Sequence, residues 1–103
     1  DRTNPAAHAD VAQTAIPEAS FSLLLTTLAT QALVSLGQLA APDQEEVVVN
    51  LDFAKHCIDT LEILEYKTKG NLTPDETALI SGLLYELRMT YVAVSRQTQK
   101  VEP

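Results

Sequence analysis

The longest apolar segment of the chain runs from Ala19 to Pro42 and contains no charged residue. Within it, large side chains recur at steps of three and four residues, and further apolar positions widen this helical face. Pro17 and Ser20 predict a first helix that begins near residues 18–20 and continues to about Leu39. A helix that is apolar over more than half of its circumference is normally covered on more than one side. The positions expected to meet a second copy of the chain are Leu23, Leu25, Leu28, Leu33, Val34 and Leu36.

A break and a second helix are indicated after this segment. Pro42 and Asp43 interrupt helical structure, and the three valines at 47–49 favour an extended piece that crosses an apolar groove. Asn50 is a suitable N-cap because its side chain accepts hydrogen bonds from the free amides at a helix start. The pattern therefore predicts a second helix from Leu51 to about Lys69, with one apolar and one charged face.

The most specific local signal is the segment KTKGNLTPDE. Gly70 supplies the left-handed residue that ends the second helix. Thr73 caps the next helix, Pro74 occupies its first position, and Glu76 completes a capping box. These residues predict an antiparallel helical hairpin, whose third helix extends to near Gln97.

Together the patterns predict an all-α fold, a three-helix bundle in which the apolar first helix is followed by the hairpin. Residues 1–17 hold almost no large apolar side chains and are expected to form a mobile, disordered N-terminal tail. The bundle domain should span residues 18–98, and residues 99–103 should form a frayed C-terminus. Because so short a chain buries only a small core, we expect a homodimer or a small even-numbered oligomer with the first helix at its centre.

Charge and cysteine content narrow the partners and the compartment. A net charge of -7, with 14 acidic and 7 basic residues, argues against binding to nucleic acid or to anionic lipid. The first helix is long enough to span a bilayer, but its hydroxyl and amide side chains and the lack of Lys or Arg flanks argue against membrane insertion. The single cysteine excludes an intrachain disulfide and fits a reducing, cytoplasmic location. No signal peptide is visible, although the chain does not begin with Met.

Two arrangements in the second helix resemble chemical sites. His56 and Cys57 are neighbours in sequence, but on a helix their side chains diverge by about 100° and cannot share a proton. Asp52, His56 and Asp59 lie along one face, a spacing that suits a metal ion but is also ordinary for a solvated face. We therefore expect no catalytic residue, no metal and no cofactor.

A third arrangement lies on the predicted third helix. Tyr85, Arg88 and Tyr91 lie close together there and could clamp the carboxylate of a small ligand. A salt bridge between subunits, or one with an acidic residue such as Glu62, explains Arg88 equally well. Tyrosines at helical spacing are usually packed.

Three segments resemble a known family: FSLLLTTLATQALVSLG, LDFAKHCIDTLEILEYKTKGNLTPDE and LLYELRMTYV. They are similar to a bacterial family of small uncharacterised proteins, domain of unknown function number eighteen forty-four. The resemblance covers about Phe21 to Val94. It departs between Ala40 and Asn50, where QEEVVV stands in place of a Gly-containing acidic turn. The resemblance implies a small, mostly helical protein without an established activity.

Three hypotheses for function follow. The leading one is a small acidic, non-enzymatic interaction module that self-associates through the first helix. The alternative is a binding protein for a small apolar or acidic ligand held between helices near Tyr85, Arg88 and Tyr91. An enzyme of unrecognised type is weaker, because no paired carboxylates, phosphate-binding glycine loop or triad ordering is visible.

Overall fold

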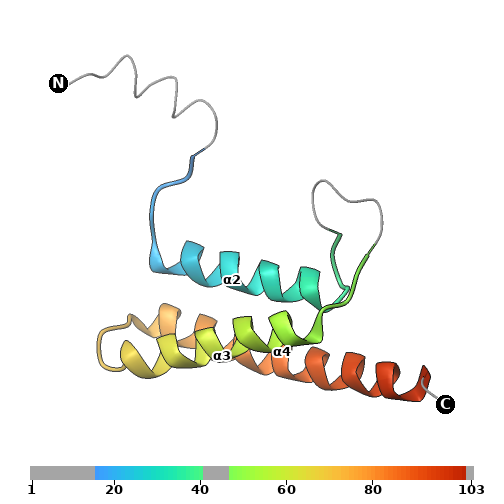
Figure 1. The fold of residues 1–103 in the computed structure, drawn as a ribbon. Coiled ribbons are helices and arrows are strands. Elements are labelled where there is room, and N and C mark those ends of the chain that lie inside the picture. Colours follow the sequence, from blue (N-terminus) through green and yellow to red (C-terminus); the bar gives the residue numbers. More distant parts are fainter. Residues whose placement is uncertain (1–15, 41–46, 102–103) are drawn as a thin grey trace.

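The computed structural model describes residues 16–40 and 47–101. Three helices make up this part of the chain: α2 (Phe21–Ser35), α3 (Leu51–Lys67) and α4 (Pro74–Val101). Successive helices run in opposite directions, and α2 forms one layer that lies against the α3/α4 hairpin (Figure 1). The predicted all-α, three-helix architecture is confirmed, and the described residues contain no strand. Nearly all of the predicted tail lies outside the described residues.

The end of α2 differs from the prediction. The helix stops at Ser35, four residues before Leu39. Gly37 adopts a left-handed conformation with φ +79°, and the N–H of Gln38 donates to the carbonyl of Leu33 at 2.9 Å. This is the hydrogen bond of a Schellman motif, which requires a residue of positive φ just after the helix. The predicted end of the first helix was wrong because the helical spacing of apolar residues continues past the position where the chain reverses.

The residues just before α3 pack against the end of α2. A Cβ atom added to Gly37 would lie 2.9 Å from Cγ2 of Val49 and 3.2 Å from Cγ1 of Val47. The N–H of Asn50 donates to the carbonyl of Ser35 at 2.7 Å. The valines were expected to cross an apolar groove, but they remain 46% to 61% exposed, and the contact described for them is at the end of α2. The preceding residues, 41–46, lie outside the described part of the chain.

The hairpin turn has the predicted chemistry. α3 begins after the N-cap Asn50 and ends at Lys67, two residues before the expected position. Gly70 has φ +86°, and the N–H of Asn71 donates to the carbonyl of Thr68 at 2.9 Å. Gly70 has the expected positive φ, but it is the third residue of a tight turn after α3, not the residue that ends the helix, because the C-cap is Thr68.

The start of α4 is fixed by the predicted capping box. The N–H of Glu76 donates to Oγ1 of Thr73 at 3.1 Å, and the N–H of Thr73 donates to Oε1 of Glu76 at 2.9 Å. Pro74 is the first helical residue. The helix continues to Val101, beyond the expected end near Gln97, so the segment expected to fray is helical over residues 99–101.

The core lies where the three helices meet, and each helix supplies several apolar side chains. Its buried members are Leu25, Ala29, Ala32, Leu36, Ala54, Cys57, Ile58, Leu61, Ile80, Leu84, Leu87 and Val94. α4 has 28 residues against 17 in α3, a difference of about 16 Å at 1.5 Å per residue. The C-terminal end of α4 therefore projects beyond the bundle (Figure 1). Val94 is the last core residue of that helix.

Candidate functional site

Four of the six interface candidates on α2 lie on the inner side of the bundle. Leu25 and Leu36 are 0% and 1% exposed, and Leu28 and Leu33 are half-buried against the core. A side chain without exposed surface cannot contact a second copy of the chain. We therefore reassign Leu25 and Leu36 from the predicted interface to the core of the single chain. The sequence did not separate these roles because almost every side of α2 is apolar.

The outward side of α2 retains the other candidates. Leu23 and Val34 are half-buried, and Leu24 is exposed. Among them lie exposed threonines, including Thr27, whose hydroxyl donates to the carbonyl of Leu23 at 2.9 Å. A hydroxyl that already donates to a carbonyl of its own helix has less need of a hydrogen bond to water. This side of α2 is therefore uncharged and less polar than its composition indicates.

A stripe of exposed residues on α4 was not singled out in the sequence. It contains Tyr85, Met89 and Val92, which are 63%, 57% and 44% exposed. Together with other exposed residues they follow steps of four, three, four, three and four along the helix. We call this set the outer seam of α4; its members are Ala78, Gly82, Tyr85, Met89, Val92 and Arg96. The signal was present in the sequence, but the inner positions of the same helix share the spacing.

The proposed ligand trio is only partly brought together. Arg88 and Tyr91 line a groove of about 350 Å³ between α3 and α4, whereas Tyr85 does not line it. Arg88 forms a salt bridge with Glu62 of α3, and Tyr91 is half-buried against the core. The Glu62 salt bridge offered as an explanation of Arg88 is thus present, and Tyr85 lies outside the groove that Arg88 and Tyr91 line.

The rim of this groove is already neutralised by ion pairs. Nζ of Lys55 lies 2.8 Å from Oδ2 of Asp59, and this hydrogen bond and the carboxylate charge raise the pKa of Lys55. Arg88 is occupied by Glu62 in the same way. A ligand carboxylate would have to share the guanidinium with the negatively charged Glu62. The groove consequently favours an apolar ligand over an acidic one.

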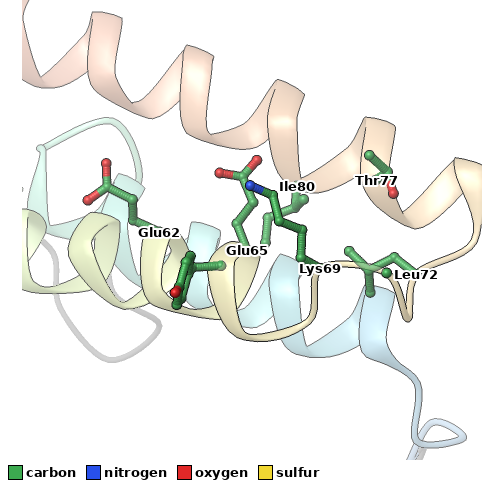
Figure 2. A pocket seen from close by; sticks show the side chains of 8 residues that line it. Glu62, Glu65, Lys69, Leu72, Thr77 and Ile80 are labelled. Atoms are coloured by element: carbon green, nitrogen blue, oxygen red, sulfur yellow. The ribbon is translucent and has the colours of Figure 1, made fainter.

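A second hollow lies at the turn of the hairpin and measures about 520 Å³. In Figure 2, Glu62 and Glu65 project from α3, Lys69 follows the end of that helix, and Thr77 and Ile80 belong to α4. Its remaining lining residues are Tyr66, Gly70 and Leu72. The rim thus mixes acidic and basic groups, and the lining contains no His or Cys to form a usual nucleophile and base pair.

The neighbouring residues His56 and Cys57 have separate environments. Cys57 is 1% exposed, and burial raises the pKa of its thiol, which keeps it protonated and unreactive. The ring of exposed His56 stacks on Phe53, with centroids 5.7 Å apart and an interplanar angle of 28°. Among residues 16–40 and 47–101 there is no group of three or more His, Cys, Asp or Glu residues that could hold a metal ion, so Asp52, His56 and Asp59 do not form one.

Membrane insertion can be assessed for the same described residues. None of their helices combines the length and apolar character needed to cross a bilayer. α2 is the most apolar helix but has only 15 residues, whereas a spanning helix needs about 20.

Three helices of alternating direction, joined by one capped hairpin, define a small all-α domain. A family model described as domain of unknown function DUF1844 matches residues 18–93, and the chain belongs to this family. The resemblance noted in the sequence is thereby confirmed. No curated protein and no solved structure matches the chain. The function must therefore be argued from the surfaces described above.

Proposed function

We propose that this domain is a non-enzymatic interaction module that associates with a second copy of itself. The observation that carries the proposal is the set of large apolar side chains that stay exposed after the bundle has formed. On the three helices these are Leu24, Phe53, Ile63, Tyr66, Tyr85, Met89 and Val92. Soluble monomers rarely expose apolar patches much larger than a few hundred Å², and a two-fold dimer is the commonest closed assembly that covers one.

The negative charge of the chain limits which of its surfaces can pair with a second copy. Two copies of a chain with a net charge of -7 repel each other unless they meet through faces with few carboxylates. α3 has four carboxylates against two lysines, so its exposed side stays acidic and is poorly suited to self-association even with Asp59 and Glu62 held in ion pairs. The outward side of α2, with Leu23 and Val34, has no charge, and the six members of the outer seam of α4 include no carboxylate, although exposed Glu86 borders them. These two surfaces are the candidates for pairing.

Analytical ultracentrifugation tests the proposal directly. Sedimentation of the full chain at about 10 to 100 micromolar should show a species of twice the 11.2 kDa chain mass, with a dissociation constant in the micromolar range. The expected affinity is modest because the exposed apolar faces are small. A well-folded monomer throughout this range would refute self-association.

The groove beside Arg88 and Tyr91 supports a second candidate function, the binding of a small apolar ligand. Its volume of about 350 Å³ suits a small molecule. Native mass spectrometry of protein purified without denaturation separates the two functions. A bound molecule of constant mass would favour ligand binding, whereas whole multiples of the chain mass alone would favour the interaction module.

A cytoplasmic location is part of the proposal. The one cysteine, Cys57, is a free thiol buried in the core. Such a thiol suits a reducing compartment, where disulfides do not persist. Fractionation of cells that express the protein would test this location.

A further inference from the structure

α4 presents apolar side chains on two opposite sides, although the bundle uses only one. Its inner side contributes Ile80, Leu84 and Leu87 to the core. Met89 follows Ile80 by nine residues, which corresponds to about 180° around the helix. The outer seam of α4 therefore faces away from the core, and its 3-4 spacing is that of a helix that packs on another helix.

Gly82 supplies a second observation that does not depend on apolar side chains. It is exposed in the interior of α4, and a Cβ atom added there would have no neighbour within 4 Å. Glycine weakens a helix interior relative to alanine, and nothing in the described chain requires it at this position. A close approach by the backbone of another helix gives it a role, since a side chain would keep that helix at a distance.

We propose that the outer seam of α4 is the surface through which two copies pair, with their α4 helices antiparallel. The two-fold axis passes through the seam at the level of position 87 along the helix. This inference rests on the proposed self-association and assigns its surface. In such a pair, residue 82 lies opposite residue 92, residue 85 opposite residue 89, and residue 78 opposite residue 96.

The seam is self-complementary in this arrangement. The open space beside Gly82 receives Val92 of the other copy, and the ring of Tyr85 meets the thioether of Met89, a favourable contact between sulfur and an aromatic ring. Arg96 lies opposite the small Ala78, near the acidic first turn of the other α4. A parallel pair would instead place each Arg96 against its own copy, and the two cations would repel.

The available area also suits a second copy. At roughly 200 Å² for a fully exposed side chain of this size, the exposed fractions of Tyr85, Met89 and Val92 amount to about 300 Å² per chain. The smaller members and the stem of Arg96 bring the patch to about 500 Å², within the range of functional patches. Two copies would then bury about 1,000 Å², which meets the lower limit for a specific interface.

Sedimentation of charged variants tests the surface against a matched control. Met89→Lys places a charge in the middle of the seam, and Ile63→Lys does the same on α3 at nearly equal exposure, 57% against 58%. We expect the dimer dissociation constant to rise at least about tenfold for Met89→Lys and to stay unchanged for Ile63→Lys. Circular dichroism should show the same helix content for both, because neither side chain belongs to the core.

The outward side of α2 provides the decisive comparison. Val34→Lys should leave the dimer intact if α4 forms the interface. A dimer that resists Met89→Lys but is lost in Val34→Lys would overturn the assignment to α4 and leave self-association standing. A wild-type chain that stays monomeric at every concentration would overturn both the proposed function and this inference.

Disulfide cross-linking tests the antiparallel orientation. Cys57 is buried and does not compete, so single cysteines can be introduced at the ends of the seam as Ala78→Cys and Arg96→Cys. When one variant carries a mass tag, mild oxidation of the mixture should give mainly the tagged 78 to 96 pair. Efficient linking of either variant to itself would show a parallel pair, and the absence of any cross-link above that of the wild-type chain would overturn the seam.

Discussion

Replacement of Gly37 by alanine tests the structure at the end of α2. With φ at +79°, an alanine would be held in the left-handed region at a cost of about 1 kcal/mol. Its Cβ would also lie 2.9 Å from Cγ2 of Val49 and 3.2 Å from Cγ1 of Val47. Valine is stiff at χ1, so relief of this contact should cost about 1 kcal/mol more. We expect Gly37→Ala to lower the free energy of unfolding by about 2 kcal/mol in total.

Gly70→Ala is the matched control for this change. Gly70 has nearly the same φ, +86°, but nothing lies within 4 Å of an added Cβ. Its loss should therefore be the backbone part alone, about 1 kcal/mol. The difference between the two variants isolates the contact with the valines. In a Val49→Ala background, the effect of Gly37→Ala should shrink toward that of Gly70→Ala.

Urea unfolding followed by far-ultraviolet circular dichroism measures these losses. All variants should be compared at one protein concentration, because dimer formation adds to the apparent stability. For a domain of this size, 1 kcal/mol also corresponds to about 4 to 8 °C in melting temperature, so a thermal melt would resolve the same difference between variants. Equal losses for Gly37→Ala and Gly70→Ala would refute the packing of the valines on Gly37. No loss in either would refute the left-handed conformation of both glycines.

Three further substitutions probe other parts of the fold. Glu76→Ala removes half of the capping box and should lower the free energy of unfolding by about 1 kcal/mol in the same assay, whereas an unchanged value would refute the cap. Gly82→Ala should raise the stability of the dilute monomer by about 0.5 to 1 kcal/mol while it weakens the dimer in sedimentation; a dimer of undiminished affinity would contradict close approach. Burial raises the pKa of the Cys57 thiol, so at alkaline pH the folded chain keeps a proton that the unfolded chain releases. The free energy of unfolding is therefore at its full value below about pH 8.5 and declines as the pH rises above it. That decline should be smaller in Cys57→Ala when urea unfolding is compared across pH values, and an equal decline in both proteins would refute the effect.

The hairpin could be predicted from sequence because its determinants are local. Gly70, Thr73 and Glu76 each act on backbone groups within three residues, so their spacing alone specifies the geometry. The end of α2 depends on Gly37 in the same local way. Leu36 and Leu39 extend the apolar spacing across the turn, so the periodicity alone predicts a helix that is four residues too long.

The candidate surfaces could not be predicted in the same way, because they depend on which side of each helix turns inward. α2 is apolar on most sides, and only its contacts with α3 and α4 show that Leu25 faces the core whereas Val34 faces outward. On α4, Tyr85 and Arg88 are three residues apart and were grouped for that reason. The salt bridge from Arg88 to Glu62 draws the arginine toward α3 and leaves Tyr85 on the outer seam.

The connection between α2 and α3 gives the chain a place where its length can change. Its two ends are already joined, by the contact of Val49 with Gly37 and by the hydrogen bond from Asn50 to Ser35. Between ends that are already joined, the closure entropy of a loop rises slowly, by about 0.6 kcal/mol for each doubling of its length. A reporter peptide inserted there would leave the hairpin and the outer seam of α4 unaltered. The assembly of the domain could then be followed in living cells by a label that lies outside the surface under test.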